Sequence, residues 1–187
     1  SDAAVAGIER LLATAAPDER RIGAVKMGTT VATNALLERR GEPTLLVVTS
    51  GLRDVLRIGH QHRPDIFARH IRLPSMLYSR AVEARERIAA DGTVLEPLDE
   101  AALVRDLAAA RKDGVRAVAI ALLHAVRNPV HERRAIELAL AAGFEEVVAS
   151  HVAAPIIGLI ARGDSAVADA YLSPVLMRHL QAFRADL

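Results

Sequence analysis

The stretch TLLVVT at residues 44–49 is a continuous apolar run with β-branched residues and no charge. Runs of this kind are typical of strands that are buried on both faces of a sheet, as in parallel sheets covered by helices. The runs VRAVAIALL at residues 115–123 and EVVAS at residues 146–150 have the same apolar character. The sequence therefore predicts a sheet built around three buried strands.

Amphipathic helices are predicted between these strands. The range 99–112 begins at Asp99, a candidate N-cap, and ends before Gly114. The range 130–142 ends before Gly143. Because strands and helices alternate along the chain, we expect an α/β fold in which a mixed or parallel sheet is flanked by helices.

The remaining segments have weaker patterns. We expect residues 1–150 to form one α/β domain and residues 151–187 to begin the next. The loop 60–77 is longer than an ordinary connection, so a functional or interfacial role is predicted for it. The other predicted elements are helices at 3–13, 31–40 (with Gly41 as C-cap) and 165–187, a short strand at 22–27, and a half-exposed strand at 82–88 with a hairpin turn at Asp91-Gly92.

Composition excludes several classes of function. The chain has 24 basic and 23 acidic residues and no extended basic tract, so no nucleic-acid partner is expected. It has no cysteine, which rules out disulfides and thiolate chemistry within the chain. No apolar run could span a membrane and no signal-peptide pattern is present, so a cytoplasmic location is expected. The high alanine and arginine content is typical of a bacterial gene.

A first candidate site is formed by Gly28, Thr29, Thr30 and Asn34, between a predicted strand and a predicted helix. Backbone N–H groups and the helix dipole converge at such positions, where α/β folds bind ligands. A structural explanation stays open, because Thr30 could simply cap the helix and Gly28 could simply permit the turn. The segment is neither a dinucleotide-binding nor a Walker motif.

A second candidate group follows the first buried strand and contains Arg53, Asp54, Gln61 and Arg63. We expect these side chains to face a substrate or a partner. The alternative is an exposed Arg53–Asp54 ion pair beside a solvated loop, which would contribute little. The two histidines in this segment lack a third ligand, so no metal site is predicted.

A third candidate group, His124, Asn128, His131 and Glu132, lies where the second buried strand ends and the next helix begins. It is predicted to form a polar edge of the sheet. The histidine and glutamate are not part of a zinc-protease motif, because residue 135 is alanine. The structural alternative is that Asn128 caps the helix and Glu132 complements its dipole.

Four long segments, in the same order and spacing, resemble the N-terminal region of the hydantoinase A and 5-oxoprolinase family. Several motifs in register are far more specific than any one of them. The segments are GTTVATNALLERRG at 28–41, GLRDVLRIGHQHRP at 51–64, DGTVLEPLD at 91–99 and AVAIALLHAVRNPVHE at 117–132.

The resemblance implies a fragment with an actin-like, ribonuclease-H-type ATPase architecture. It further implies ATP-dependent opening of cyclic amides such as hydantoins or 5-oxoproline, in which ATP and Mg²⁺ activate the carbonyl oxygen by phosphorylation. A hydantoinase B-type subunit or domain is the implied partner. Two alternatives stay open, namely a non-catalytic assembly module that uses the loop 60–77 as a contact, and a relative that carboxylates ketones.

The chain also departs from the family pattern. The glycine-rich phosphate-binding loop expected near the N-terminus is not in this sequence, so we do not expect these residues to hydrolyse ATP alone. A later family motif corresponds to residues 161–174 and retains Arg162, a further candidate binding residue, although several neighbours differ. We expect the segment before Val31 and the polar ends of the buried strands to line one common cleft.

Overall fold

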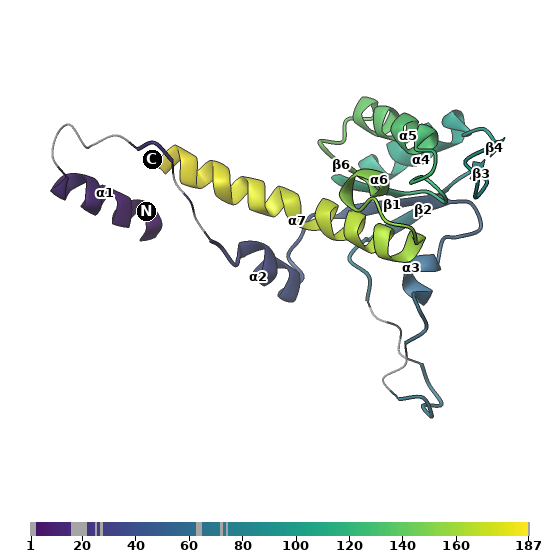
Figure 1. The fold of residues 1–187 in the computed structure, drawn as a ribbon, viewed down its shortest axis with the longest axis horizontal. Coiled ribbons are helices and arrows are strands. Elements are labelled where there is room, and N and C mark those ends of the chain that lie inside the picture. The colour runs from purple at the N-terminus through teal and green to yellow at the C-terminus, as the bar shows by residue number, and fades with distance from the viewer. Residues whose placement is uncertain are drawn as a thin grey trace.

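A computed structural model describes residues 3–15, 22–24, 26, 28–62, 65–71, 73 and 75–186. Its centre is a four-stranded sheet in which every neighbouring pair is parallel (Figure 1). All three predicted buried strands are present in it, and the sheet is parallel rather than mixed. The strand order is β2 (Arg80–Ala84), β1 (Thr44–Thr49), β5 (Ala117–Ala121) and β6 (Glu146–Ala149).

Helices cover both faces of this sheet, as predicted (Figure 1). Helices α4 (Glu100–Lys112) and α5 (Val130–Ala141) pack on one face. The short α3 (Val55–Ile58) and the first half of α7 (Leu159–Asp186) pack on the other. Every residue of β1 is buried because its side chains enter two cores, which explains why the strand has no polar alternation.

The strand predicted at 82–88 is wrong as a single element. The structure divides it into β2 and β3 (Arg87–Ile88), and only β2 joins the parallel sheet. The predicted hairpin is confirmed, since β3 pairs antiparallel with β4 (Val94–Glu96) and Gly92 adopts a φ of 95° in the turn. The break between β2 and β3 places Glu86 in a buried position.

The N-terminal part follows the prediction only in its helices. Helix α1 (Ala3–Thr14) is confirmed, but the described residues of the predicted strand at 22–27, namely 22–24 and 26, form no strand. Helix α2 (Val31–Leu37) ends before residue 40. The left-handed residue after it is Arg39, with a φ of 56°, so the prediction of Gly41 as the C-cap is wrong.

Gly41 is instead required by close packing. A Cβ atom at this position would overlap the ring of Tyr171 on α7, and the backbone N–H of the next residue, Glu42, donates to the carbonyl oxygen of Tyr171 at 2.9 Å. Through these contacts α7 packs against residues 41 and 42, which lie just before β1.

Gly41→Ala is therefore expected to lower the free energy of unfolding by about 1–3 kcal/mol, because the methyl group forces the ring or the backbone to move. Urea denaturation would measure the loss. Gly7→Ala is a matched control, because Gly7 lies in α1 with no atom near the position of an added Cβ. It should change stability by no more than about 1 kcal/mol, in the direction of greater helix propensity. Equal effects of the two changes would contradict the packing argument.

The C-terminal helix is longer than predicted. It begins at Leu159 rather than at residue 165, and it continues through Pro174. It follows the short helix α6 (Ser150–Ala153), which begins directly after β6. The first half of α7 covers the sheet and the second half extends beyond it, where the helix contacts α2 (Figure 1). The domain boundary at residue 150 stays a prediction.

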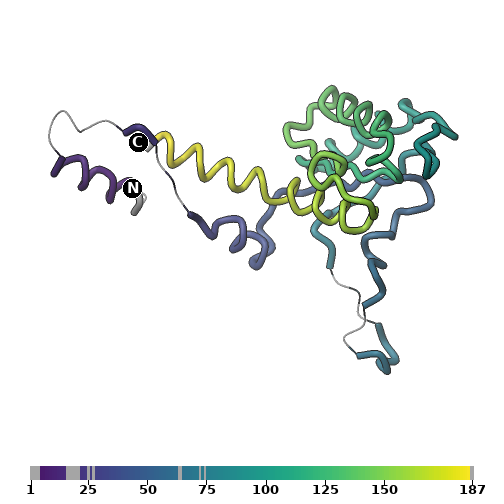
Figure 2. The backbone as a smooth tube through the Cα atoms, in the orientation of Figure 1, coloured from purple at the N-terminus to yellow at the C-terminus, as the bar shows by residue number. Residues whose placement is uncertain are grey.

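The loop 60–77 is irregular in its described residues, as predicted, and projects from the body as an arm (Figure 2). Ile66 and Phe67 on this arm are 69% and 87% exposed. An interfacial role for the arm stays a prediction. In the described ranges, no helix combines the length and the apolar character that a bilayer crossing requires.

Candidate functional site at the carboxyl edge of the sheet

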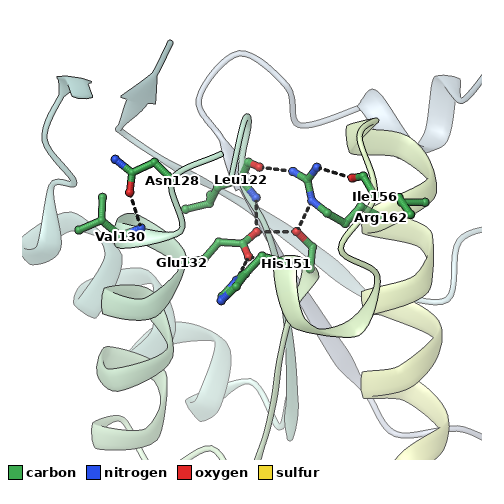
Figure 3. Close-up of polar contacts among 8 residues, drawn as sticks. Leu122, Asn128, Val130, Glu132, His151, Ile156 and Arg162 are labelled. Carbon is green, nitrogen blue, oxygen red and sulfur yellow. Dashed lines mark hydrogen bonds and ion pairs between the residues drawn. The ribbon is translucent and has the colours of Figure 1, made fainter. Parts of the chain in front are cut away.

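The carboxyl edge is the side of the sheet where β1, β5 and β6 end, and a buried glutamate lies at its centre. Glu132, in the first turn of α5, is fully buried. Its Oε1 accepts hydrogen bonds from the Leu122 N–H at 2.8 Å and from the Ser150 hydroxyl at 2.6 Å. Its Oε2 accepts from the His151 N–H at 3.0 Å and lies 2.5 Å from His151 Nδ1 (Figure 3). The carboxylate thus ties α5 to the ends of β5 and β6.

Arg162 extends this arrangement to α7. Its guanidinium donates from Nε to the Ser150 hydroxyl at 2.8 Å and from Nη2 to the Leu122 carbonyl at 2.6 Å (Figure 3). Burial lowers the pKa of Arg162, and the negative charge of Glu132 opposes this effect. The Ser150 hydroxyl therefore links a buried cation to a buried carboxylate.

A second buried carboxylate lies on the other side of β5. Glu86 accepts a hydrogen bond from the Thr49 hydroxyl, and its Oε2 lies 2.7 Å from His131 Nδ1. The Thr49 hydroxyl also accepts from the Leu123 N–H at 2.8 Å. We call the resulting set the polar network: Thr49, Glu86, His131, Glu132, Ser150, His151 and Arg162.

Both histidines of the polar network turn Nδ1 toward a buried carboxylate. A carboxylate can only accept, so Nδ1 of His131 and of His151 carries the hydrogen of each contact. No contact of either Nε2 is found in the described part of the chain, and no buried side-chain nitrogen or oxygen there lacks a partner. Both Nε2 atoms therefore border solvent, and in the neutral imidazole each is a proton acceptor.

The backbone after β5 is strained beside this network. His124 is half-buried and has a φ of 57°, a conformation that a residue with a side chain rarely adopts. Its carbonyl oxygen accepts from the Arg127 N–H at 2.8 Å. Asn128 closes the turn, since it accepts from the Val130 N–H at 3.2 Å (Figure 3). It also donates to the Gly92 carbonyl at 2.9 Å. Such strain is often found at functional sites.

Comparison with known proteins now identifies the family. The model of the hydantoinase/oxoprolinase N-terminal region matches residues 1–143. The chain belongs to the hydantoinase/oxoprolinase family. It is 37% identical over 97% of its length to 5-oxoprolinase 1 of Arabidopsis thaliana, and 38% identical over 84% to the alpha subunit of caprolactamase from Pseudomonas jessenii. A plant protein is among these relatives, so the prediction of a bacterial gene is not supported.

This chain has the same fold as solved structures of similar proteins. The crystal structure of the ATP-dependent caprolactamase from Pseudomonas jessenii covers 99% of this chain with a TM-score of 0.83 and 33% identity. An acetone carboxylase structure covers 83% with a TM-score of 0.70, and its 22% identity shows the fold alone. The parallel sheet flanked by helices is thus the actin-like architecture that the resemblance implies.

The chain is short beside its relatives in the family. It spans 17% of the length of 5-oxoprolinase 1, 23% of the caprolactamase alpha subunit and 28% of the caprolactamase chain in the crystal structure.

The structure brings only some of the predicted site residues together at the carboxyl edge. His131, Glu132 and Arg162 belong to the polar network, and His124 and Asn128 adjoin it. The structural explanation of Glu132 as a helix-dipole partner is insufficient, since the side chain is buried and accepts from two other elements.

The second predicted group lies apart from this network. Arg53 and Asp54 are exposed at the start of α3, and Gln61 is exposed at the base of the arm with a φ of 58°. Arg63 lies outside the described residues. Within the described ranges no group of three or more His, Asp or Glu side chains could hold a metal ion.

The family segment from Gly28 to Asn34 does not reach the carboxyl edge. In Figure 1, β3 and β4 lie at one end of the sheet, and α2 lies beyond the other end. The Thr29 hydroxyl accepts from the Val31 N–H at 3.2 Å, and Thr30 makes no capping hydrogen bond through its side chain. The structure therefore does not bring this segment and the polar strand ends into one cleft.

Sequence reasoning missed four members of the polar network: Thr49, Glu86, Ser150 and His151. A signal was available for Glu86, which shares the period-two register of the buried residues Val82, Ala84 and Ile88. A charged residue at an inward position of such a pattern indicates a buried, partnered side chain. Ser150 and His151 follow directly on the third apolar strand, where the same search of strand ends would have found them.

Proposed function

We propose that this chain is the N-terminal α/β part of an ATP-dependent hydrolase that opens cyclic amides of the hydantoin, 5-oxoproline or lactam type. Its family membership and its similarity to 5-oxoprolinase 1 and to caprolactamase support the reaction class. The observation on this chain that carries the proposal is the pair of carboxylate-held imidazoles at the carboxyl edge, where α/β folds bind their ligands.

The chemistry explains why ATP is needed. An unstrained amide resists attack because resonance stabilises it, whereas phosphorylation of its oxygen makes the carbon electrophilic. Once water has added to that carbon, the ring C–N bond breaks as the nitrogen takes up a proton, and the acyl phosphate that remains is hydrolysed to the acid and inorganic phosphate. Water must be deprotonated as it attacks. We assign this proton transfer to Nε2 of His131 or His151, since the buried glutamate behind each ring orients it and stabilises the imidazolium that forms.

Magnesium does not fit the described residues of this chain. Mg²⁺ requires carboxylate or other oxygen ligands with free lone pairs. Glu132 accepts four hydrogen bonds and Glu86 accepts two, and in the described part of the chain no group of three or more His, Asp or Glu side chains could hold a metal ion. We therefore derive no step through magnesium. We propose that the complete protein binds ATP and acts with a hydantoinase B-type subunit or domain. We also propose that it is located in the cytoplasm.

The proposal is tested on the complete gene product, co-purified with its B-type subunit or domain. ATP hydrolysis is measured without substrate and with hydantoin, 5-oxoproline or caprolactam, and the ring-opened acid is identified by mass spectrometry. We expect at least one ring to stimulate ATP hydrolysis and to yield its acid. ATP hydrolysis that responds to a ketone with bicarbonate, and to none of the cyclic amides, would contradict the proposal.

A further inference from the structure

A pocket of about 580 Å³ lies on the α3 side of the sheet, away from the polar network. Its walls are α3 with the turn before it, and residues 73 and 75–81, which lie between the arm and the edge strand β2 or in that strand. No member of the polar network lines it. The family motif at 51–64 supplies part of one wall, and the acid–base chemistry proposed above does not use it.

The pocket carries an excess of positive charge. Arg53, Arg57 and Arg80 line it, against a single lining carboxylate, Asp54. Arg80 is neutralised by Asp113 at 2.6 Å. The side chains of Arg53 and Arg57 make no hydrogen bond or ion pair with any described residue. Two guanidinium groups in one hollow therefore keep all their donors available.

The rest of the lining suits a small molecule rather than a bare ion. Burial raises the pKa of Tyr78. Asp54 and Asp164 raise it further, while Arg57 and Arg53 lower it, and the net shift is upward, so the phenol keeps its proton and can donate a hydrogen bond. Met76 and Leu73 provide apolar surface beside it. The volume lies within the usual range for ligand pockets, which is roughly 300–1,000 Å³.

We propose that this pocket binds a small molecule with an oxyanion head, either a phosphate or a carboxylate. The head lies between Arg53 and Arg57, because the planar guanidinium group matches both anions through paired hydrogen bonds. The body of the ligand packs on Met76 and Tyr78. This site is independent of the proposed hydrolase reaction, since it uses none of the residues assigned to that chemistry.

The test is isothermal titration calorimetry on the full chain at constant ionic strength, with inorganic phosphate in one arm and acetate in the other. The tighter of the two identifies the head group. We expect Arg53→Ala and Arg57→Ala each to weaken binding of that anion about tenfold, as the loss of one charge-assisted contact predicts. Tyr78→Phe should weaken it less, because only a neutral donor is lost.

Arg133→Ala is the matched control. Arg133 is an exposed arginine on α5, which covers the opposite face of the sheet, and its removal changes the net charge equally. It should leave binding unchanged within about twofold. The proposal is overturned if neither anion binds with a dissociation constant below about 10 mM, which corresponds to a binding free energy of about −2.7 kcal/mol. It is equally overturned if Arg133→Ala weakens binding as much as Arg57→Ala, since binding would then reflect net charge. Neither result bears on amide-dependent ATP hydrolysis.

Discussion

Glu132→Ala is expected to lower the free energy of unfolding by about 3–5 kcal/mol, which is the usual effect of removing one partner from a buried ionic network. The change leaves the Leu122 N–H and the His151 N–H without their acceptor, and it removes the carboxylate that partly offsets the buried charge of Arg162. It also opens a cavity at a fully buried position. Urea denaturation monitored by circular dichroism would measure the loss.

Glu137→Ala provides the matched control for this experiment. Glu137 lies on the same helix and is exposed, and among the described residues its ion-pair partner is Arg134, so its loss should cost less than about 1 kcal/mol. Glu132→Gln separates charge from volume, because its amide keeps the shape but directs an NH₂ group at other donors. We expect an intermediate effect of roughly 2–3 kcal/mol. If Glu132→Ala costs no more than Glu137→Ala, the polar network does not hold the carboxyl edge together.

The second large effect is expected on activity. His131→Asn or His151→Asn should lower kcat for amide-dependent ATP hydrolysis by the complete protein about 10²- to 10⁴-fold, the usual contribution of a general base. Asparagine was chosen because its side-chain NH₂ lies near the position of Nδ1. It can still donate to Glu86 or Glu132, whereas the acceptor that corresponds to Nε2 is lost. Steady-state assays of ATP hydrolysis and of the ring-opened product would follow both variants.

Two controls accompany these variants. His179→Asn, on the second half of α7, removes a histidine that is not part of the polar network and should retain full activity. Circular dichroism and the urea midpoint should be close to those of the unaltered protein for all three variants, so that a loss of kcat reports chemistry. Activity within about twofold of normal in both His131→Asn and His151→Asn would exclude the general-base assignment, since a base contributes far more.

The sheet and its helices were predictable from the chain because local patterns encode them. The run at 44–49 is apolar throughout and forms β1 with the predicted bounds. Asp99 was predicted as an N-cap, and its side chain accepts from the Ala102 N–H at 3.0 Å. Such features depend on neighbours in sequence, so the sequence displays them directly.

The failures share a physical origin in contacts between distant residues. The pattern at 82–88 alternates like one strand, but Glu86 turns inward to meet Thr49 and His131, and the strand ends there. Gly41 was predicted to end a helix, whereas the ring of Tyr171 accounts for the glycine. No local pattern records a partner that is many residues away.

The candidate site was half predictable for the same reason. Family motifs and strand ends identified His131, Glu132 and Arg162, all members of the polar network. The hydroxyls of Thr49 and Ser150, which connect the charged groups, resemble ordinary strand-end residues in the sequence. Their role depends on the parallel order of β1, β5 and β6, which brings three separate strand ends to one edge.

The central claim is that two buried carboxylates hold two imidazoles with Nε2 turned toward solvent. Long-range ¹H–¹⁵N NMR spectra of the labelled chain at about pH 9, where imidazoles are neutral, report directly which ring nitrogen carries the hydrogen. The account predicts the Nδ1–H tautomer for both His131 and His151, with signals assigned through the asparagine variants. The Nε2–H tautomer at both residues would contradict it.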